Sequence, residues 1–182
     1  SWDRSNWAVY GDVEMHLSQA FLFGVAIRYE NFSDFGGNLD GKISALKAIN
    51  DKITLRGSIS SGFKAPSIGQ SNVVNVTTAY SPQGLEDQAT LPPTHPIPVQ
   101  LGANPLQPEK SINLSFGLVS EPTDNFYLTL DYFNIHLQDR ISTTSPLYLS
   151  AEDIQILLDA GVSEASNYGS AKFFTNDFDS ST

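Results

Sequence analysis

The side chains with the widest chemical range in this sequence are three histidines, His16, His95 and His136, and two carboxylates, Asp12 and Glu14. The histidines lie far apart in the chain and lack the short spacing of metal ligands on one helix or turn. Asp12 and Glu14 fall on one face of a predicted strand, as an acid–base pair would. A hydrated strand face explains both carboxylates more simply, so we assign them no catalytic role.

Motifs of known enzymes are absent from the sequence. There is no Gly-x-Ser-x-Gly elbow, no His-Glu-x-x-His motif and no phosphate-binding loop. The chain has no cysteine, which removes disulfides, thiolate ligands and thiol nucleophiles. The acidic pairs Glu86-Asp87 and Glu152-Asp153 lack the spacing of a calcium loop, so we interpret them as solvated charge. We predict no catalytic residues, no metal site, no cofactor and no enzymatic activity.

The composition narrows the class of protein further. The 182 residues include 20 acidic and 10 basic side chains, a formal net charge of −10. A chain this acidic has no basic stripe for nucleic acid and little attraction for an anionic membrane surface. Only 16% of residues are charged while 11% are aromatic, which favours an ordered chain. No apolar run approaches the roughly 18 residues of a membrane-spanning helix, so a soluble β domain and a membrane β-barrel remain.

Alternation of apolar and polar residues with a period of two is the dominant pattern, and it predicts β-strands. We expect strands over residues 6–17, 21–32, 39–49, 52–62, 111–118 and 126–137, with the start of an unpartnered seventh over 171–175. Within residues 126–137 the apolar positions change from even to odd near Tyr132. Either a β-bulge re-aims the side chains there or the strand passes into another environment.

The connections between these strands alternate in length. Tight turns are expected near Gln19, at Asn50-Asp51 and near Thr123, whereas residues 67–107 and 139–170 form long loops. The second loop should contain one short helix, capped by Ser150 and ended by Gly161. In an up-and-down sheet all the tight turns then lie at one end, as in outer-membrane barrels with short periplasmic turns. A soluble sandwich also alternates, so patterning alone leaves both architectures open.

Residues 56–67, Arg-Gly-Ser-Ile-Ser-Ser-Gly-Phe-Lys-Ala-Pro-Ser, resemble a segment of the TonB-dependent receptors of Gram-negative outer membranes. In that family a strand ending in Arg-Gly-Ser-x-Ser-x-Gly-Phe-Arg-Ala-Pro-Ser precedes a large external loop. The shared core of the motif is Gly62, Phe63, Lys64, Ala65 and Pro66, with Lys64 in place of the commoner arginine. We interpret this group as structural, because Pro66 lacks the N–H of a strand ladder and would fix where the strand leaves the membrane.

Further segments resemble the same family in the same order along the chain. The stretch from Asn104 and Pro105 to Glu109 is similar to the segment that re-enters the barrel, with Leu106 one position early. Residues 128–135, followed by Asp139 and Arg140, resemble the next strand and its exit. Residues 28–36 resemble an earlier strand and its turn, and 173–182 the approach to a later one.

The resemblance implies an all-β fold, an antiparallel up-and-down transmembrane barrel of 22 strands, of which six or seven lie here. It implies an outer-membrane location and partners comprising membrane lipid, a plug domain, the TonB complex and a scarce small ligand. That ligand would be an iron-siderophore, haem, cobalamin or a carbohydrate, with the siderophore the most common. The plug, the TonB box and the closing C-terminal strand have no counterpart here, so the chain resembles a fragment of such a receptor.

Four residues are candidates for ligand contact under this interpretation. Arg28, Arg56 and Asp131 would face the lumen and line the ligand path or hold the plug. His95 lies in the interval where haem receptors of the family carry a haem-ligating histidine, although its neighbours here are prolines. A passive porin-like channel or a surface adhesin built on similar strands remains the alternative function.

Overall fold

The computed structural model describes residues 3–81 and 84–176, which form two compact units. The first, which we call the sheet unit, comprises residues 3–64 and 110–138. The second, the loop unit, comprises residues 65–109 and 139–176 of the described chain. The sheet unit therefore collects the strands expected from alternation, and the loop unit collects both long segments between them.

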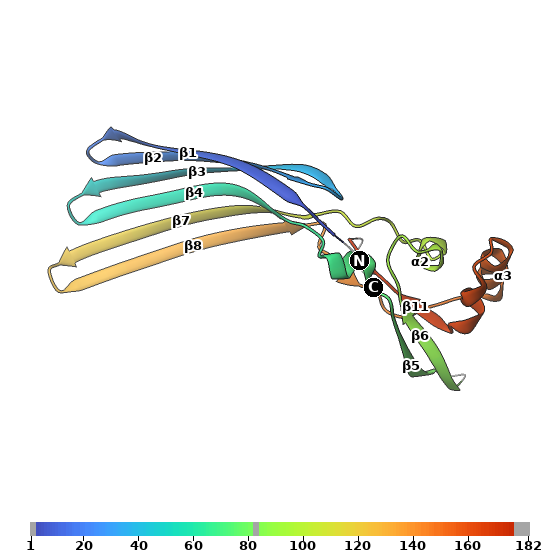
Figure 1. Cartoon of the computed structure of the whole chain (residues 1–182). Helices are drawn as coiled ribbons and strands as arrows, with labels where there is room; N and C mark the ends of the chain where they lie inside the picture. Colours follow the sequence, from blue (N-terminus) through green and yellow to red (C-terminus); the bar gives the residue numbers. More distant parts are fainter. Residues whose placement is uncertain (1–2, 82–83, 177–182) are drawn as a thin grey trace. The chain divides into compact units, whose positions relative to one another are not determined.

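The sheet unit is a single six-stranded sheet in the order β1-β2-β3-β4-β7-β8 (Figure 1). Its strands are β1 (Asn6–Ser18), β2 (Phe21–Phe32), β3 (Gly36–Asn50), β4 (Ile53–Lys64), β7 (Glu109–Thr123) and β8 (Phe126–Gln138). Consecutive sheet strands are neighbours and run antiparallel, so the predicted up-and-down topology is confirmed. The strands have 12 to 15 residues, more than the roughly 9–11 that a tilted strand needs to cross a bilayer.

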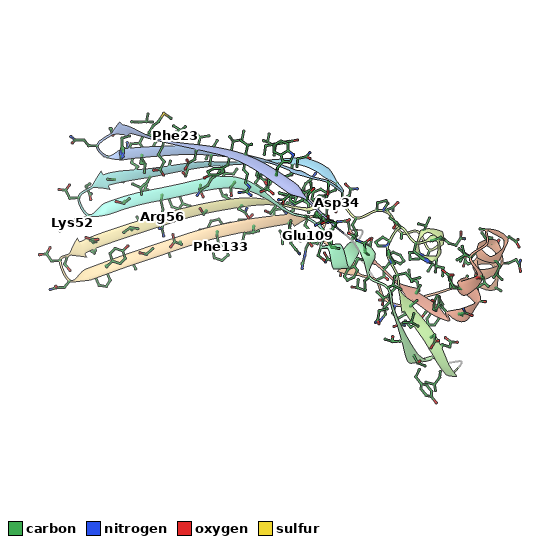
Figure 2. All side chains as sticks on the ribbon, in the orientation of Figure 1. Phe23, Asp34, Lys52, Arg56, Glu109 and Phe133 are labelled. Carbon is green, nitrogen blue, oxygen red and sulfur yellow. The ribbon has the colours of Figure 1, made fainter. Side chains whose placement is uncertain are left out.

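The three tight turns lie together at one end of the sheet (Figure 1). Lys52 in the β3–β4 turn is hydrogen-bonded to the β7–β8 end, where its carbonyl accepts from the Glu121 N–H over 2.8 Å. Its Nζ donates to the carbonyl of Pro122 over 3.0 Å. Figure 2 labels Lys52 at this end of the sheet. The predicted asymmetry of the connections is therefore present in the sheet unit.

Register places most of the apolar positions of the strands on one face of the sheet, and the second half of β8 is the main exception. A row of partners runs from Val13 through Val25 and Ile43 to Ile59. None of the large apolar residues of the sheet unit is buried, and Ile27, Ile43 and Leu114 each expose about half of their surface. Within the sheet unit no second layer packs on this apolar face, and an exposed apolar area of this extent indicates an interaction surface.

The change from even to odd apolar positions within β8 does not come from a β-bulge. The pairing of β8 with β7 is unbroken from Leu128 to Gln138, and the only irregularity lies between Ser120 and Thr123 of β7. A bulge near Tyr132 is therefore absent. Regular alternation instead carries Phe133 and its successors Ile135 and Leu137 onto the polar face, where Phe133 is 73% exposed.

The loop unit is more regular than the proline-rich sequence indicates. It contains three α-helices, α1 (Ile68–Asn72), α2 (Pro96–Gln100) and α3 (Ala151–Asp159), and the short 3-10 helix η1 (Ser163–Asn167). Its strands are β5 (Asn75–Ser81), β6 (Gly84–Thr90), β9 (Ser142–Thr143), β10 (Leu147–Tyr148), β11 (Ser170–Lys172) and β12 (Phe174–Thr175). They form one sheet in the order β10-β11-β6-β5 and a second small sheet of β12 and β9.

The prediction of an unpartnered seventh strand over residues 171–175 is wrong. These residues form β11 and β12, which pair with β6, β10 and β9 inside the loop unit. They are neither unpartnered nor part of the six-stranded sheet. The partners lie in segments whose prolines indicated irregular loop, and β6 pairs with β11 in parallel across about 80 positions of the chain.

The loop unit has a small hydrophobic core of its own, and both long segments contribute to it. The core residues are Ala89, Leu91, Ile97, Leu157, Ala165 and Ala171. The predicted helix after Ser150 is present, with Ser150 and Asp153 forming a capping box and Gly161 following at φ +86°. Prolines are also part of the folded interior of the loop unit, because Pro93 and Pro98 are fully buried. No helix in the described ranges is long and apolar enough to cross a membrane.

Candidate ligand-binding surfaces

The polar face of the sheet carries an ion pair between Arg56 of β4 and Asp131 of β8, with β7 lying between these strands. Arg56 Nη2 donates to both carboxylate oxygens over 2.8 Å, and Nε donates to Oδ1 over 3.2 Å. The pair crosses β7 at Gly117, where a Cβ would overlap both the Arg56 side chain and Asp131 Oδ1. Glycine at this position therefore leaves the space through which the two charges meet.

This ion pair borders a hollow of about 440 Å³ on the polar face. Ser58 and Ser115 line it and share a hydrogen bond of 2.8 Å between their hydroxyls. Phe133, which lies on the edge strand β8 in Figure 2, adds an aromatic ring to the same lining. The hollow therefore combines a charge pair, hydroxyl groups and an apolar ring.

Arg28 occupies the same face in a second hollow of about 410 Å³. Its guanidinium contacts Glu30 on its own strand, and its register partner Asp40 bonds Asn38 at 2.8 Å and Ser61 at 3.1 Å. Three of the four predicted ligand residues thus lie on one face of the sheet. The structure brings Arg56 and Asp131 together but leaves Arg28 in a separate network.

His95, the fourth candidate, caps helix α2 in the loop unit. Its Nδ1 accepts a hydrogen bond from the Ile97 N–H at 3.3 Å, so a neutral ring carries its proton on Nε2. Nε2 lies 3.2 Å from Glu164 Oε1 of η1. Both ring nitrogens are therefore engaged, and ligation of haem by Nε2 would require the contact with Glu164 to break. No three histidine or acidic side chains gather as a metal site in residues 3–81 and 84–176.

The motif residues around Phe63 anchor the end of β4. The Phe63 ring packs against Phe32 and Phe35, with ring centroids 5.7 Å and 6.4 Å away. Arg4 completes this cluster, because it pairs with Asp34 at 2.6 Å and stacks over Phe35 at 5.3 Å. Beyond the strand, Pro66 is buried and Ser67 caps helix α1. The interpretation that the motif fixes where the strand leaves the membrane stays a prediction.

The second group of motif residues forms a hydrogen-bonded arrangement within the loop unit. Glu109 Oε1 accepts from the Ile141 N–H at 2.8 Å. Asn176 accepts from the Gln107 N–H at 2.7 Å and donates back to the Gln107 carbonyl at 2.9 Å. It also donates to the carbonyl of Asp139, which holds a left-handed φ of +55°. Asn104, Pro105 and Arg140 flank this arrangement and are exposed.

Asn176 lies in the segment 173–182 that resembles the family, but no role was predicted for it from the sequence, and the structure shows it as a positioning residue. Its side-chain amide pairs with Gln107 as a backbone amide pairs in a strand ladder, and it ties in a third segment at Asp139. The sequence offered one signal, which is an Asn directly after a short strand, since such residues bond neighbouring backbone. Residues 177–182, also part of the family resemblance, lie outside the described chain.

A family model described as TonB dependent receptor-like, beta-barrel, matches residues 1–173. The siderophore receptor PirA from Pseudomonas aeruginosa is 18% identical with a TM-score of 0.69, covering 95% of this chain and 28% of that one. The ferric enterobactin receptor PfeA of the same organism, in a mutant form, is 17% identical with a TM-score of 0.68. That match covers 95% of this chain and 22% of PfeA. No curated protein sequence matches.

Proposed function

Since this chain belongs to the TonB-dependent receptor-like β-barrel family, we propose that it forms part of an outer-membrane receptor for active uptake of an iron-siderophore. The observation that carries the proposal is the sheet, whose uncovered apolar face opposes a face with charges and hollows. Lipid would cover the first face and the second would line the lumen. The family is one of transporters and receptors and is not an enzyme class.

The remainder of the receptor would supply what six strands lack. The chain spans about a quarter of the length of the solved receptors that it resembles, so the plug and the remaining strands belong to the proposal. The unpaired edges of β1 and β8 would join neighbouring strands, because open sheet edges are not stable in hydrocarbon. The plug would fill the lumen beside the polar face and connect uptake to the TonB complex.

The proposed mechanism divides the work between the two units. Residues 67–107 and 139–170, which fold together in the loop unit, would capture the ligand outside the cell. Arg56 and Asp131 would then line the path through the lumen or hold the plug, and Arg28 would do so in its own hollow. The siderophore preference draws on the similarity to PirA, a siderophore receptor, and to PfeA, a ferric enterobactin receptor.

Uptake in cells tests the proposal against a passive channel. The complete receptor containing this segment should accumulate a radioactive ferric siderophore only when the TonB complex is intact. Deletion of residues 70–104 should abolish ligand binding and leave the barrel inserted. Accumulation that persists without TonB would favour a passive channel, and full ligand binding after the deletion would contradict the role of the loops.

A further inference from the structure

The loop unit carries a strongly unbalanced charge. Its described residues include eight carboxylates, namely Glu86, Asp87, Glu109, Asp139, Glu152, Asp153, Asp159 and Glu164. Arg140 and Lys172 are the only arginine and lysine in the same residues. A formal charge of −6 on a unit this small gives a negative potential that attracts cations and repels anions before contact. Screening restricts this effect to about 8 Å at physiological salt, so contact residues decide the affinity.

One cavity of about 710 Å³ lies wholly within the loop unit. Two aromatic residues, Tyr148 and Tyr168, line it together with Asn167 and Glu86, and no lysine or arginine does so. Tyr148 is 57% exposed, so part of its surface remains open to a ligand. The faces of tyrosine rings attract ammonium groups, so the tyrosines and the carboxylates both favour a cationic ligand.

Glu86 is the decisive residue of this cavity. Its side chain is half-buried and packs against Gly169, where a Cβ would overlap the carboxylate. No residue in the described chain forms an ion pair or a side-chain hydrogen bond with this carboxylate. The adjacent Asp87, by contrast, accepts from Thr78 Oγ1 at 3.0 Å. A half-buried carboxylate without a protein partner is suited to a ligand that brings its own cationic donor.

We propose that this cavity binds a ligand ammonium group between Glu86 and the two tyrosines. The inference rests on the proposed function and specifies its substrate as a cationic ferric siderophore. Three hydroxamates carry one negative charge each and neutralise Fe³⁺, so a pendant ammonium makes the complex cationic. Three catecholates carry two charges each and leave a complex of charge −3, which the cavity would repel.

Three probes separate charge from iron binding. They are a ferric trihydroxamate with one free ammonium, the same complex with that amine acetylated, and a ferric tricatecholate. We expect the complete receptor, purified in detergent, to bind the ammonium complex about tenfold more tightly than the acetylated one, about 1.4 kcal/mol. The preference should shrink as salt rises, because screening weakens partly exposed charge pairs.

Glu86→Gln removes the charge with little change in shape and should abolish the preference for the ammonium complex. Glu152→Gln removes the same charge from an exposed position of helix α3 outside the cavity, and should preserve the preference within about twofold. Tyr148→Ala should weaken binding of the ammonium complex. Circular dichroism of each variant establishes that the fold is retained.

The outcomes distinguish this inference from the proposed function. Equal affinity for the ammonium and acetylated complexes, or a preference that survives Glu86→Gln, would overturn the cavity assignment. TonB-dependent uptake of the tricatecholate alone would overturn it too and leave siderophore uptake standing. Failure of all three complexes to bind or enter the cell would reject the siderophore ligand and this inference together.

Discussion

Arg56 of β4 and Asp131 of β8 form an ion pair on the polar face that passes over Gly117 of the intervening strand β7. Both side chains are about half exposed, so the pair itself should contribute only about 0.3–1 kcal/mol. Its position is the more informative property, because a residue with a Cβ at 117 would separate the charges.

Gly117→Ala should uncouple Arg56 from Asp131. A double-mutant cycle of Arg56→Met and Asp131→Asn, measured by urea unfolding of the lipid-embedded receptor, should give a coupling of about 0.3–1 kcal/mol in the native background. The same cycle in the Gly117→Ala background should give a coupling near zero. An undiminished coupling there would show that the charges find another route across β7.

The loop unit should depend on its buried core. Ile97→Ala removes a fully buried side chain of helix α2 and should destabilise the loop unit by about 2–5 kcal/mol. Val99→Ala, in the same helix but 53% exposed, is the matched control and should have a small effect. Limited proteolysis should cut the Ile97 variant faster within residues 65–109 and 139–176. Equal cleavage of both variants would argue against a cooperative loop unit.

Asn176 should be required for the arrangement of the loop-unit backbone around Gln107 and Asp139. Asn176→Asp keeps an oxygen acceptor for the Gln107 N–H but loses both donors of the side-chain amide. We expect a loss of about 1–3 kcal/mol in the local stability of residues 104–109, seen as faster hydrogen exchange. Asn104→Ala alters an exposed residue nearby and serves as the control. Unchanged exchange in the Asp variant would refute the role.

Acid should weaken the N-terminus of helix α3. Hydrogen bonds from the Ser150 side chain, then Gln100 and the Ser150 backbone, lower the pKa of Asp153 from its ordinary value of 3.8. A carboxylate with a lowered pKa stabilises the fold above the unfolded pKa, and that contribution disappears as pH falls through the folded value. Hydrogen exchange of α3 should therefore accelerate below about pH 4, and Asp153→Asn should remove this dependence. A pH profile identical in both proteins would contradict the assignment.

The six sheet strands could be predicted because apolar and polar residues alternate along each of them. The apolar row from Val13 to Ile59 is an example of the pairing that results. The same pattern placed Arg28, Arg56 and Asp131 on the polar face. It could not show that Arg56 and Asp131 meet while Arg28 stays apart, because that depends on the pairing of β4 with β7 and on the space at Gly117.

The loop unit could not be predicted in the same way. Its parallel pairing of β6 with β11 joins residues about 80 positions apart, and no local pattern marks such a contact. In the sequence, prolines such as Pro93 and Pro98 indicated an irregular loop. In the structure both are fully buried, because the fixed backbone angle of proline is compatible with an ordered fold. The helix after Ser150 was predictable because its capping signals are local.

The claim on which all else depends is that lipid covers the apolar face of the sheet. The chain lacks cysteine, so a single engineered cysteine labels one site in it. A fluorescent label at Val25→Cys, Ile59→Cys or Leu114→Cys in the membrane-embedded receptor should be quenched by brominated acyl chains and protected from aqueous iodide. Labels at Ser44→Cys and Ser58→Cys, on the polar face, should escape acyl-chain quenching. If brominated acyl chains fail to quench the label at all three apolar positions, the account is contradicted, because another layer of protein would then cover that face.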